Sequence, residues 1–142
     1  MDIFSIAEKY ITENFPNTTI LKDEPLKKHT SFKIGGCVPM LIIPDSTEAY
    51  AKIYEYFTTS DVCPLVIGNG TNILAEDCPL PFPVIKTHGK AENIRLISET
   101  EIEADCGVTL AQIAMFAMRN GLTGMEFAHA VIKQDFTFPK EL

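Results

Sequence analysis

The sequence has no long hydrophobic run. No apolar stretch approaches the roughly 18 to 20 residues that a membrane-spanning helix needs. The first residues, Met1 to Phe4, carry an acid early and lack the basic region followed by an apolar region that marks a secretory signal. These absences predict a cytoplasmic protein without a membrane partner.

Positive charge is also scarce. The chain has 12 Lys and Arg against 19 Asp and Glu, which gives a net charge of -7 and a pI near 4.9. The few bases are scattered along the sequence. Because nucleic acids and anionic lipids are bound through clustered Lys and Arg, we expect no nucleic-acid partner.

The cysteines and histidines do not follow a metal-ligand pattern. No Cys-x-x-Cys pair occurs, and each residue of both types stands alone: Cys37, Cys63, Cys78, Cys106, His29, His88 and His129. Protein zinc sites usually need more closely spaced ligands. We therefore expect no metal site. In a reducing compartment the cysteines are expected to be free, small core residues.

What is present fits one domain with a core, because 142 residues are too few for two ordinary domains and 46% of them are hydrophobic. Apolar spacing and capping residues predict helices over 2–14, for about three turns after Asp45, and from Thr109 to a stop at Gly121, with a buried stripe of Leu110, Ile113, Ala114 and Ala117. Strands are predicted at 38–44, 65–67 and 83–86, with a hairpin at 93–98 and 101–106. Residues 17–28 are predicted to be a linker or an extended arm.

The segment from Leu65 to Leu74 is the candidate site. A short apolar strand meets the loop Gly68-Asn69-Gly70-Thr71-Asn72, whose glycines can bring bare backbone close to a ligand. Successive N–H groups in such a loop can bind a phosphate, but Asn-Gly is also a common hairpin turn. The predicted strand, helix, strand order puts the loop at the carboxyl end of a parallel strand. That position favours the phosphate site over the turn.

Three segments in this order resemble the FAD-binding half of the UDP-N-acetylenolpyruvoylglucosamine reductase family. They are His29–Gly36, Val66–Leu74 and Gly121–Ala128. The resemblance covers roughly residues 20–130. It implies an N-terminal helix and arm over 1–19, a partial FAD-binding domain over 20–130 and a divergent tail over 131–142.

The fold that this resemblance implies is α+β, an FAD-binding PCMH-type fold with two subdomains, as in relatives of vanillyl-alcohol oxidase. The cofactor-binding residues that it implies are Ile67, Gly68, Asn69, Gly70, Thr71 and Asn72 around the FAD pyrophosphate, followed by Gly107 and Gly124. Gly35 and Gly36 are expected to let the chain turn beside the next strand. His29 is expected to be a structural hydrogen-bonding residue, and Lys33 stands where the family often has Arg.

The resemblance breaks off after Ala130. The family continues with Ile-Pro-Gly, whereas this chain reads Val131-Ile132-Lys133. We therefore expect an incomplete fold, weak FAD binding, no catalytic residue and negligible reductase activity from this chain alone. In the intact family NADPH reduces FAD and a UDP-sugar is the substrate. A missing C-terminal half would leave an exposed face and favour self-association.

Three other functions remain open from the sequence. The same half-fold could serve as a non-catalytic binding or interaction module, or as one half of a split FAD oxidoreductase whose second half is a separate chain. An FAD oxidoreductase acting on a different alcohol or sugar is the weaker alternative, because Gly124–Ala128 resembles the cell-wall reductases in particular.

Overall fold

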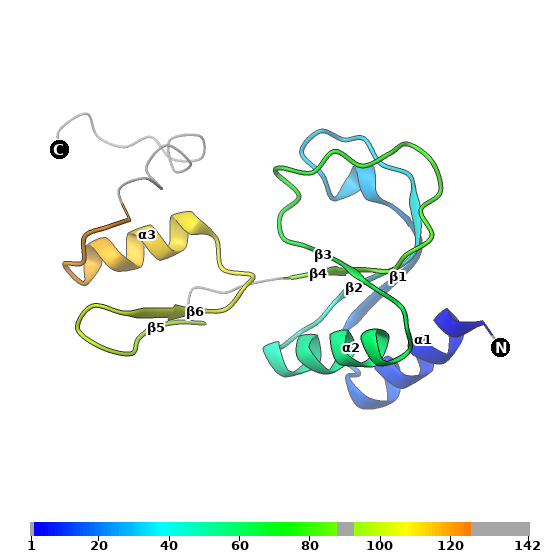
Figure 1. Cartoon of the computed structure of the whole chain (residues 1–142), viewed down its shortest axis with the longest axis horizontal. Helices are drawn as coiled ribbons and strands as arrows, with labels where there is room; N and C mark the ends of the chain where they lie inside the picture. Colours follow the sequence, from blue (N-terminus) through cyan, green and yellow to red (C-terminus); the bar gives the residue numbers. More distant parts are fainter. Residues whose placement is uncertain (1, 88–92, 126–142) are drawn as a thin grey trace. The chain divides into compact units, whose positions relative to one another are not determined.

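The structure is a computed structural model that describes residues 2–87 and 93–125. It divides into two compact units, Met1–His88 and Gly89–Leu142, which are described separately (Figure 1). In the described ranges no helix is both long enough and apolar enough to cross a membrane.

A four-stranded sheet is the centre of the first unit. Its strands are β1 (Thr19–Pro25), β2 (Cys37–Ile43), β3 (Leu65–Ile67) and β4 (Val84–Lys86), in the order β1-β2-β4-β3. β4 runs parallel to both of its neighbours, and β1 runs antiparallel to β2. The expected parallel arrangement of β2 and β3 is therefore present, but β4 lies between them. β4 comes later in the chain than β2 and β3 and pairs with both of them.

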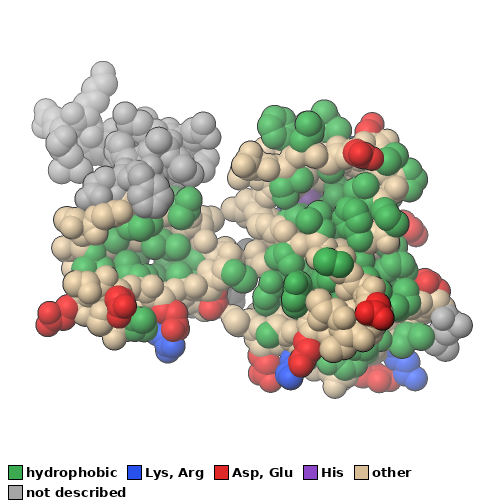
Figure 2. Space-filling view, in the orientation of Figure 1, with side chains coloured by type: hydrophobic (Ala, Val, Ile, Leu, Met, Phe, Trp, Pro, Cys, Tyr) green, Lys and Arg blue, Asp and Glu red, His purple; other side chains and the backbone are tan. Residues whose placement is uncertain are grey.

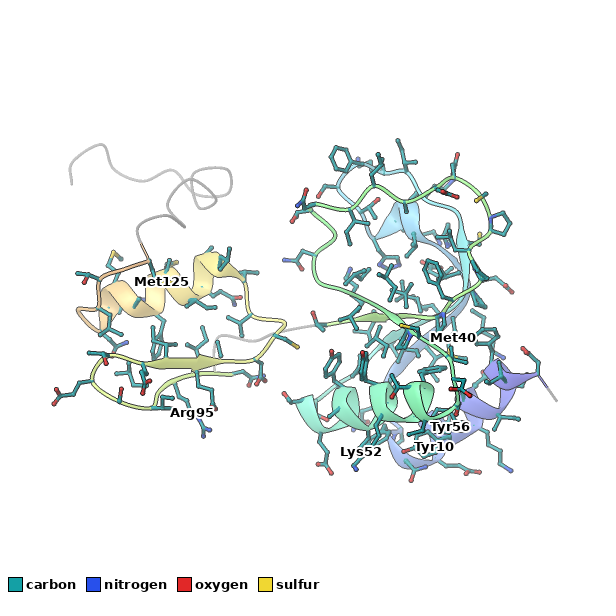
Figure 3. The ribbon with its side chains drawn as sticks, in the orientation of Figure 1. Tyr10, Met40, Lys52, Tyr56, Arg95 and Met125 are labelled. Atoms are coloured by element: carbon teal, nitrogen blue, oxygen red, sulfur yellow. The ribbon has the colours of Figure 1, made fainter. Side chains whose placement is uncertain are left out.

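Helices cover one face of this sheet (Figure 1). They are α1 (Ile3–Asn14) and α2 (Thr47–Thr59), and α2 begins after Ser46, whose side chain accepts a hydrogen bond from the Ala49 N–H. The core on this face consists of Ala7, Ile11, Met40, Ile42, Ala49, Ile53, Phe57 and Ile85. At its edge the rings of Tyr10 and Tyr56 stack with centroids 4.3 Å apart, and Met40 lies between the sheet and the helices (Figure 3).

Loops and a short 3-10 helix, η1 (Leu26–Lys28), cover the other face (Figure 1). A second apolar cluster lies there, formed by Leu26, Val38, Leu41, Ile67 and Val84. The candidate loop leaves the sheet on this side, directly after Ile67. The sheet therefore separates the helical core from the candidate site.

The expected linker or arm at 17–28 is wrong in part, because residues 19–25 form β1. Its middle residues Lys22 and Asp23 are exposed and polar, so the segment lacks the apolar pattern of a strand. β1 is an edge strand that pairs with β2 from Thr19↔Ile43 to Pro25↔Cys37. The conformation of β1 is determined by its backbone hydrogen bonds to β2. The pattern of apolar and polar side chains along a sequence does not reveal such hydrogen bonds.

The second unit holds the predicted hairpin, with β5 (Ile94–Leu96) antiparallel to β6 (Ile102–Ala104). It also holds α3 (Leu110–Arg119), which begins with the predicted capping box between Thr109 and Gln112. The predicted buried stripe of α3 is wrong at Leu110, which is 44% exposed, whereas Ala117 is buried. Leu110 is the first residue of the helix, where few neighbouring turns can cover a side chain.

The cysteines are free, as expected, but they are not core residues. All four are exposed: Cys37, Cys63, Cys78 and Cys106. Cys37 begins β2 and the other three lie outside strands and helices. Small size and low polarity suit cysteine to a core, but these positions lie where the chain runs along the surface.

Candidate functional site

The candidate loop begins where two parallel strands end together. Ile67 of β3 is the register partner of Lys86 of β4. One residue on, both the N–H and the hydroxyl of Thr87 donate to the carbonyl oxygen of Ile67, at 2.8 and 3.2 Å. This double hydrogen bond holds the end of β3. The chain that follows starts from a fixed point at the carboxyl edge of the sheet.

The loop itself presents unused hydrogen-bond donors. Among the described residues, no backbone N–H from Gly68 to Ile73 donates a hydrogen bond. The side chains of Asn69, Thr71 and Asn72 also make no hydrogen bond there, and all three residues are exposed. A run of free N–H groups with hydroxyl and amide donors beside it is the donor set of an anion site.

Gly70 holds the loop against the segment that follows η1. Its φ is +65°, and a Cβ built on it would lie 2.0 Å from the carbonyl oxygen of His29. In return the Ser31 N–H donates to the Gly70 carbonyl at 3.0 Å. Gly70 is therefore required for contact within the protein. At Gly68 the nearest atom to a built Cβ is the Thr87 hydroxyl at 4.0 Å, so this glycine has open space around it.

Gly35 and Gly36 lie where the segment 29–36 contacts the later part of the loop 68–78. Gly35 has a φ of +147°, and the Gly36 N–H donates to the Glu76 carbonyl at 2.8 Å. A Cβ on Gly36 would lie only 1.7 Å from the carbonyl oxygen of Cys78. Both glycines lie directly before β2, and Gly36 is in close backbone contact with residues 76–78. The segment 29–36 and the loop 68–78 thus pack backbone against backbone.

A group of charged side chains adjoins this contact. His29 Nε2 lies 3.0 Å from Oε1 of Glu24, and Nδ1 of the same ring lies 3.3 Å from Nζ of Lys86. Lys28 Nζ lies 3.4 Å from the other Glu24 oxygen. Burial raises the pKa of Glu24, but hydrogen bonds from His29 and Lys28 outweigh it and hold this pKa below its ordinary value. His29 is a structural hydrogen-bonding residue, as expected.

The remaining expected site residues lie elsewhere. Gly107 is in the turn before α3, and Gly124 follows that helix with a φ of +104°. Both belong to the second unit. Lys33 is exposed and has a φ of +55°. In the described ranges no group of three or more His, Cys, Asp or Glu could hold a metal ion.

The surface around the loop is apolar as well as polar. Hydrophobic side chains gather at the surface of the first unit, while Lys and Arg are few on the face in view (Figure 2). Phe32, Ile34 and Leu74, from the two segments that meet here, are 58%, 44% and 74% exposed. Free N–H donors beside exposed apolar side chains would suit a cofactor with both a phosphate and an aromatic part.

Comparison with known proteins agrees with this geometry. The FAD binding domain family matches residues 38–132, a range that contains all but the first residue of β2, together with α2, β3, the candidate loop, β4, β5, β6 and α3. The chain belongs to the FAD binding domain family. The resemblance found in the sequence is thereby confirmed. The expected boundaries at residues 20 and 130 remain a prediction.

The proteins with similar sequences are named as reductases. The UDP-N-acetylenolpyruvoylglucosamine reductase of Syntrophomonas wolfei subsp. wolfei is 36% identical over 121 residues, which are 85% of this chain and 40% of that protein. The reductase of the same name from Alkaliphilus oremlandii is 31% identical over 88% of this chain and 41% of its own length. The chain therefore spans about two fifths of the length of these relatives.

A solved structure shows the same fold. The UDP-N-acetylenolpyruvylglucosamine reductase (MurB) of Thermus caldophilus matches 77% of this chain and 36% of its own with a TM-score of 0.52 and 24% identity. The α+β FAD-binding fold expected from the sequence is confirmed.

The sequence alone did not indicate Glu24, Lys86 and Thr87 as residues of the site. Lys86 is the last residue of a strand that was correctly predicted, and Thr87 follows it directly. Their position at the end of this strand could have indicated that both lie near the loop. Glu24 lies in the segment that was expected to be a linker or arm. Its approach to His29 depends on β1 pairing with β2.

Proposed function

We propose that this chain binds FAD as the cofactor-binding part of a UDP-N-acetylenolpyruvoylglucosamine reductase. The run of N–H groups from Gly68 to Ile73 at the carboxyl end of β3, which donate no hydrogen bond within the described part of the chain, carries the proposal. The membership of the FAD binding domain family and the reductase relatives support it. Such an enzyme would reduce UDP-N-acetylglucosamine enolpyruvate to UDP-N-acetylmuramate.

The loop would hold the pyrophosphate of FAD. The residues that we assign to it are Ile67, Gly68, Asn69, Gly70, Thr71 and Asn72. Backbone N–H groups suit this role because they are fixed in place and carry no charge of their own that water must solvate. Gly107 and Gly124 are proposed as secondary cofactor-binding residues.

The residues of the loop fit the cofactor. Its donors have no partner among the described residues, and Gly68 leaves open space where a side chain would otherwise stand. Gly70 and Thr87 keep the backbone in place without occupying that space. When bound, FAD would supply the electron transfer of the reductase, and the protein would bind and orient it.

Binding of cofactor fragments tests this proposal. The full chain is titrated with FAD, ADP-ribose and riboflavin, and binding is followed by flavin fluorescence and by calorimetry. We expect FAD and ADP-ribose to bind more tightly than riboflavin, which has no phosphate. If riboflavin bound as tightly as FAD, the loop would not be a pyrophosphate site. If neither FAD nor ADP-ribose bound, the proposed function would be wrong.

A further inference from the structure

The side chain of Lys86 carries a charge that no carboxylate of the described residues balances. Its Nζ lies 3.3 Å from Nδ1 of His29, and within the ranges 2–87 and 93–125 no Asp or Glu oxygen forms an ion pair with it. The residue is only half exposed. Partly burying an ammonium group without a counter-ion costs free energy, so an anion at this place would be stabilised.

The position of Lys86 relates this charge to the candidate loop. Lys86 is the last residue of β4 and the register partner of Ile67, after which the loop begins. Side chains alternate along a strand, so Lys86 lies on the same face as Val84, the face covered by η1 and the loops. Its partner His29 contacts Gly70 through its carbonyl group. The ammonium group and the loop are thus held by the same neighbouring segment.

Glu24 and His29 set the direction of the lysine side chain. An ionised carboxylate only accepts hydrogen bonds and an ammonium group only donates them. His29 must therefore donate from Nε2 to Glu24 and accept at Nδ1 from Lys86, which is the neutral form of the ring. With Lys28 also bound to Glu24, this group of four side chains has one positive charge more than it has negative charges.

We propose that Lys86 is a further binding residue of the site, which supplies positive charge to the anionic group held by residues 68–73 and is positioned by His29 and Glu24. The N–H groups of the loop donate hydrogen bonds that orient the anionic group, and Lys86 adds a positive charge, which the N–H groups lack. This inference rests on the proposed phosphate recognition but not on the flavin part of the cofactor.

The test compares three variants with the unaltered chain. Lys86→Met removes the charge and keeps most of the side-chain stem, whereas Lys86→Arg keeps the charge. Lys9→Met is the matched control, because it makes the same charge change on α1, which covers the opposite face of the sheet. Thermal unfolding of each variant shows whether it is folded. Each is then titrated with FAD, inorganic pyrophosphate and riboflavin at two salt concentrations.

We expect Lys86→Met to bind FAD and pyrophosphate about tenfold more weakly or worse, which is the effect of losing one hydrogen bond to a charged group. Its binding should also depend less on salt. Riboflavin binding should not change, Lys86→Arg should recover most of the affinity, and Lys9→Met should match the unaltered chain.

The outcomes separate this inference from the proposed function. If the folded Lys86→Met chain bound FAD and pyrophosphate as tightly as the unaltered chain, the role of Lys86 would be refuted while FAD binding stood. If the unaltered chain bound pyrophosphate in a Lys86-dependent way but not FAD, the inference would hold and the proposed function would fail. If it bound neither anion, both would be refuted.

Discussion

Gly70 and His29 are in backbone contact across 41 residues of sequence, so close that a single added carbon on Gly70 would lie 2.0 Å from the His29 carbonyl oxygen. This contact joins the first two sequence segments on which the family resemblance rests. It gives the second glycine of the loop a structural role, whereas the first, Gly68, faces open space.

We therefore expect the same substitution to affect stability at Gly70 but not at Gly68. Gly70→Ala should lower the free energy of unfolding by about 1–3 kcal/mol or more, because it combines a positive φ with a clash against fixed backbone. Gly68→Ala should leave stability within about 0.5 kcal/mol but weaken FAD binding. Urea unfolding and FAD titration of both variants measure this. Equal stability of the two would contradict the contact with His29.

Glu24 makes stability depend on pH. Its pKa in the folded chain lies below the ordinary value of 4.5, so its ionised form stabilises the fold above that pH. This contribution is lost as the pH falls through the lowered pKa. We expect the difference in unfolding free energy between the unaltered chain and Glu24→Gln to be greatest near neutral pH and to shrink below about pH 4.5.

Urea unfolding at a series of pH values from 7 to 3 provides the measurement. Glu13→Gln is the matched control, since the Glu13 side chain is 61% exposed and lies on α1. A gap between the unaltered chain and Glu24→Gln that stays constant over the whole range would show that the hydrogen bonds from His29 and Lys28 do not favour the ionised carboxylate.

The helical face of the sheet should carry much of the stability. Phe57→Ala should lower the unfolding free energy by about 3–5 kcal/mol, because Phe57 is fully buried between α2 and the sheet and its loss leaves a cavity. Phe32→Ala makes the same chemical change at a side chain that is 58% exposed, and should cost less than about 0.5 kcal/mol. Similar losses in both variants would show that the packing around Phe57 is loose.

Much of the fold was predictable from local pattern. Helical spacing located α1, α2 and α3, with capping residues before α2 and α3, because each helix has an apolar side. Short apolar runs located β2, β3 and β4, and β2 and β4 contribute buried residues to both apolar clusters. β1 was not predictable in this way, since its polar residues form an edge strand. The order of strands was also missed, because the central position of β4 depends on pairing between distant segments.

For the candidate site, the sequence by itself determined the loop, the residues at the end of β3 and the family to which the chain belongs. Glycine, asparagine and threonine in this order carry that information locally, in their backbone freedom and their hydrogen-bonding groups. Only the tertiary structure decided what each glycine does and which charges stand beside the loop. Gly70 meets His29, and Glu24 reaches Lys86 through His29, because the strands bring together residues that are far apart in the chain.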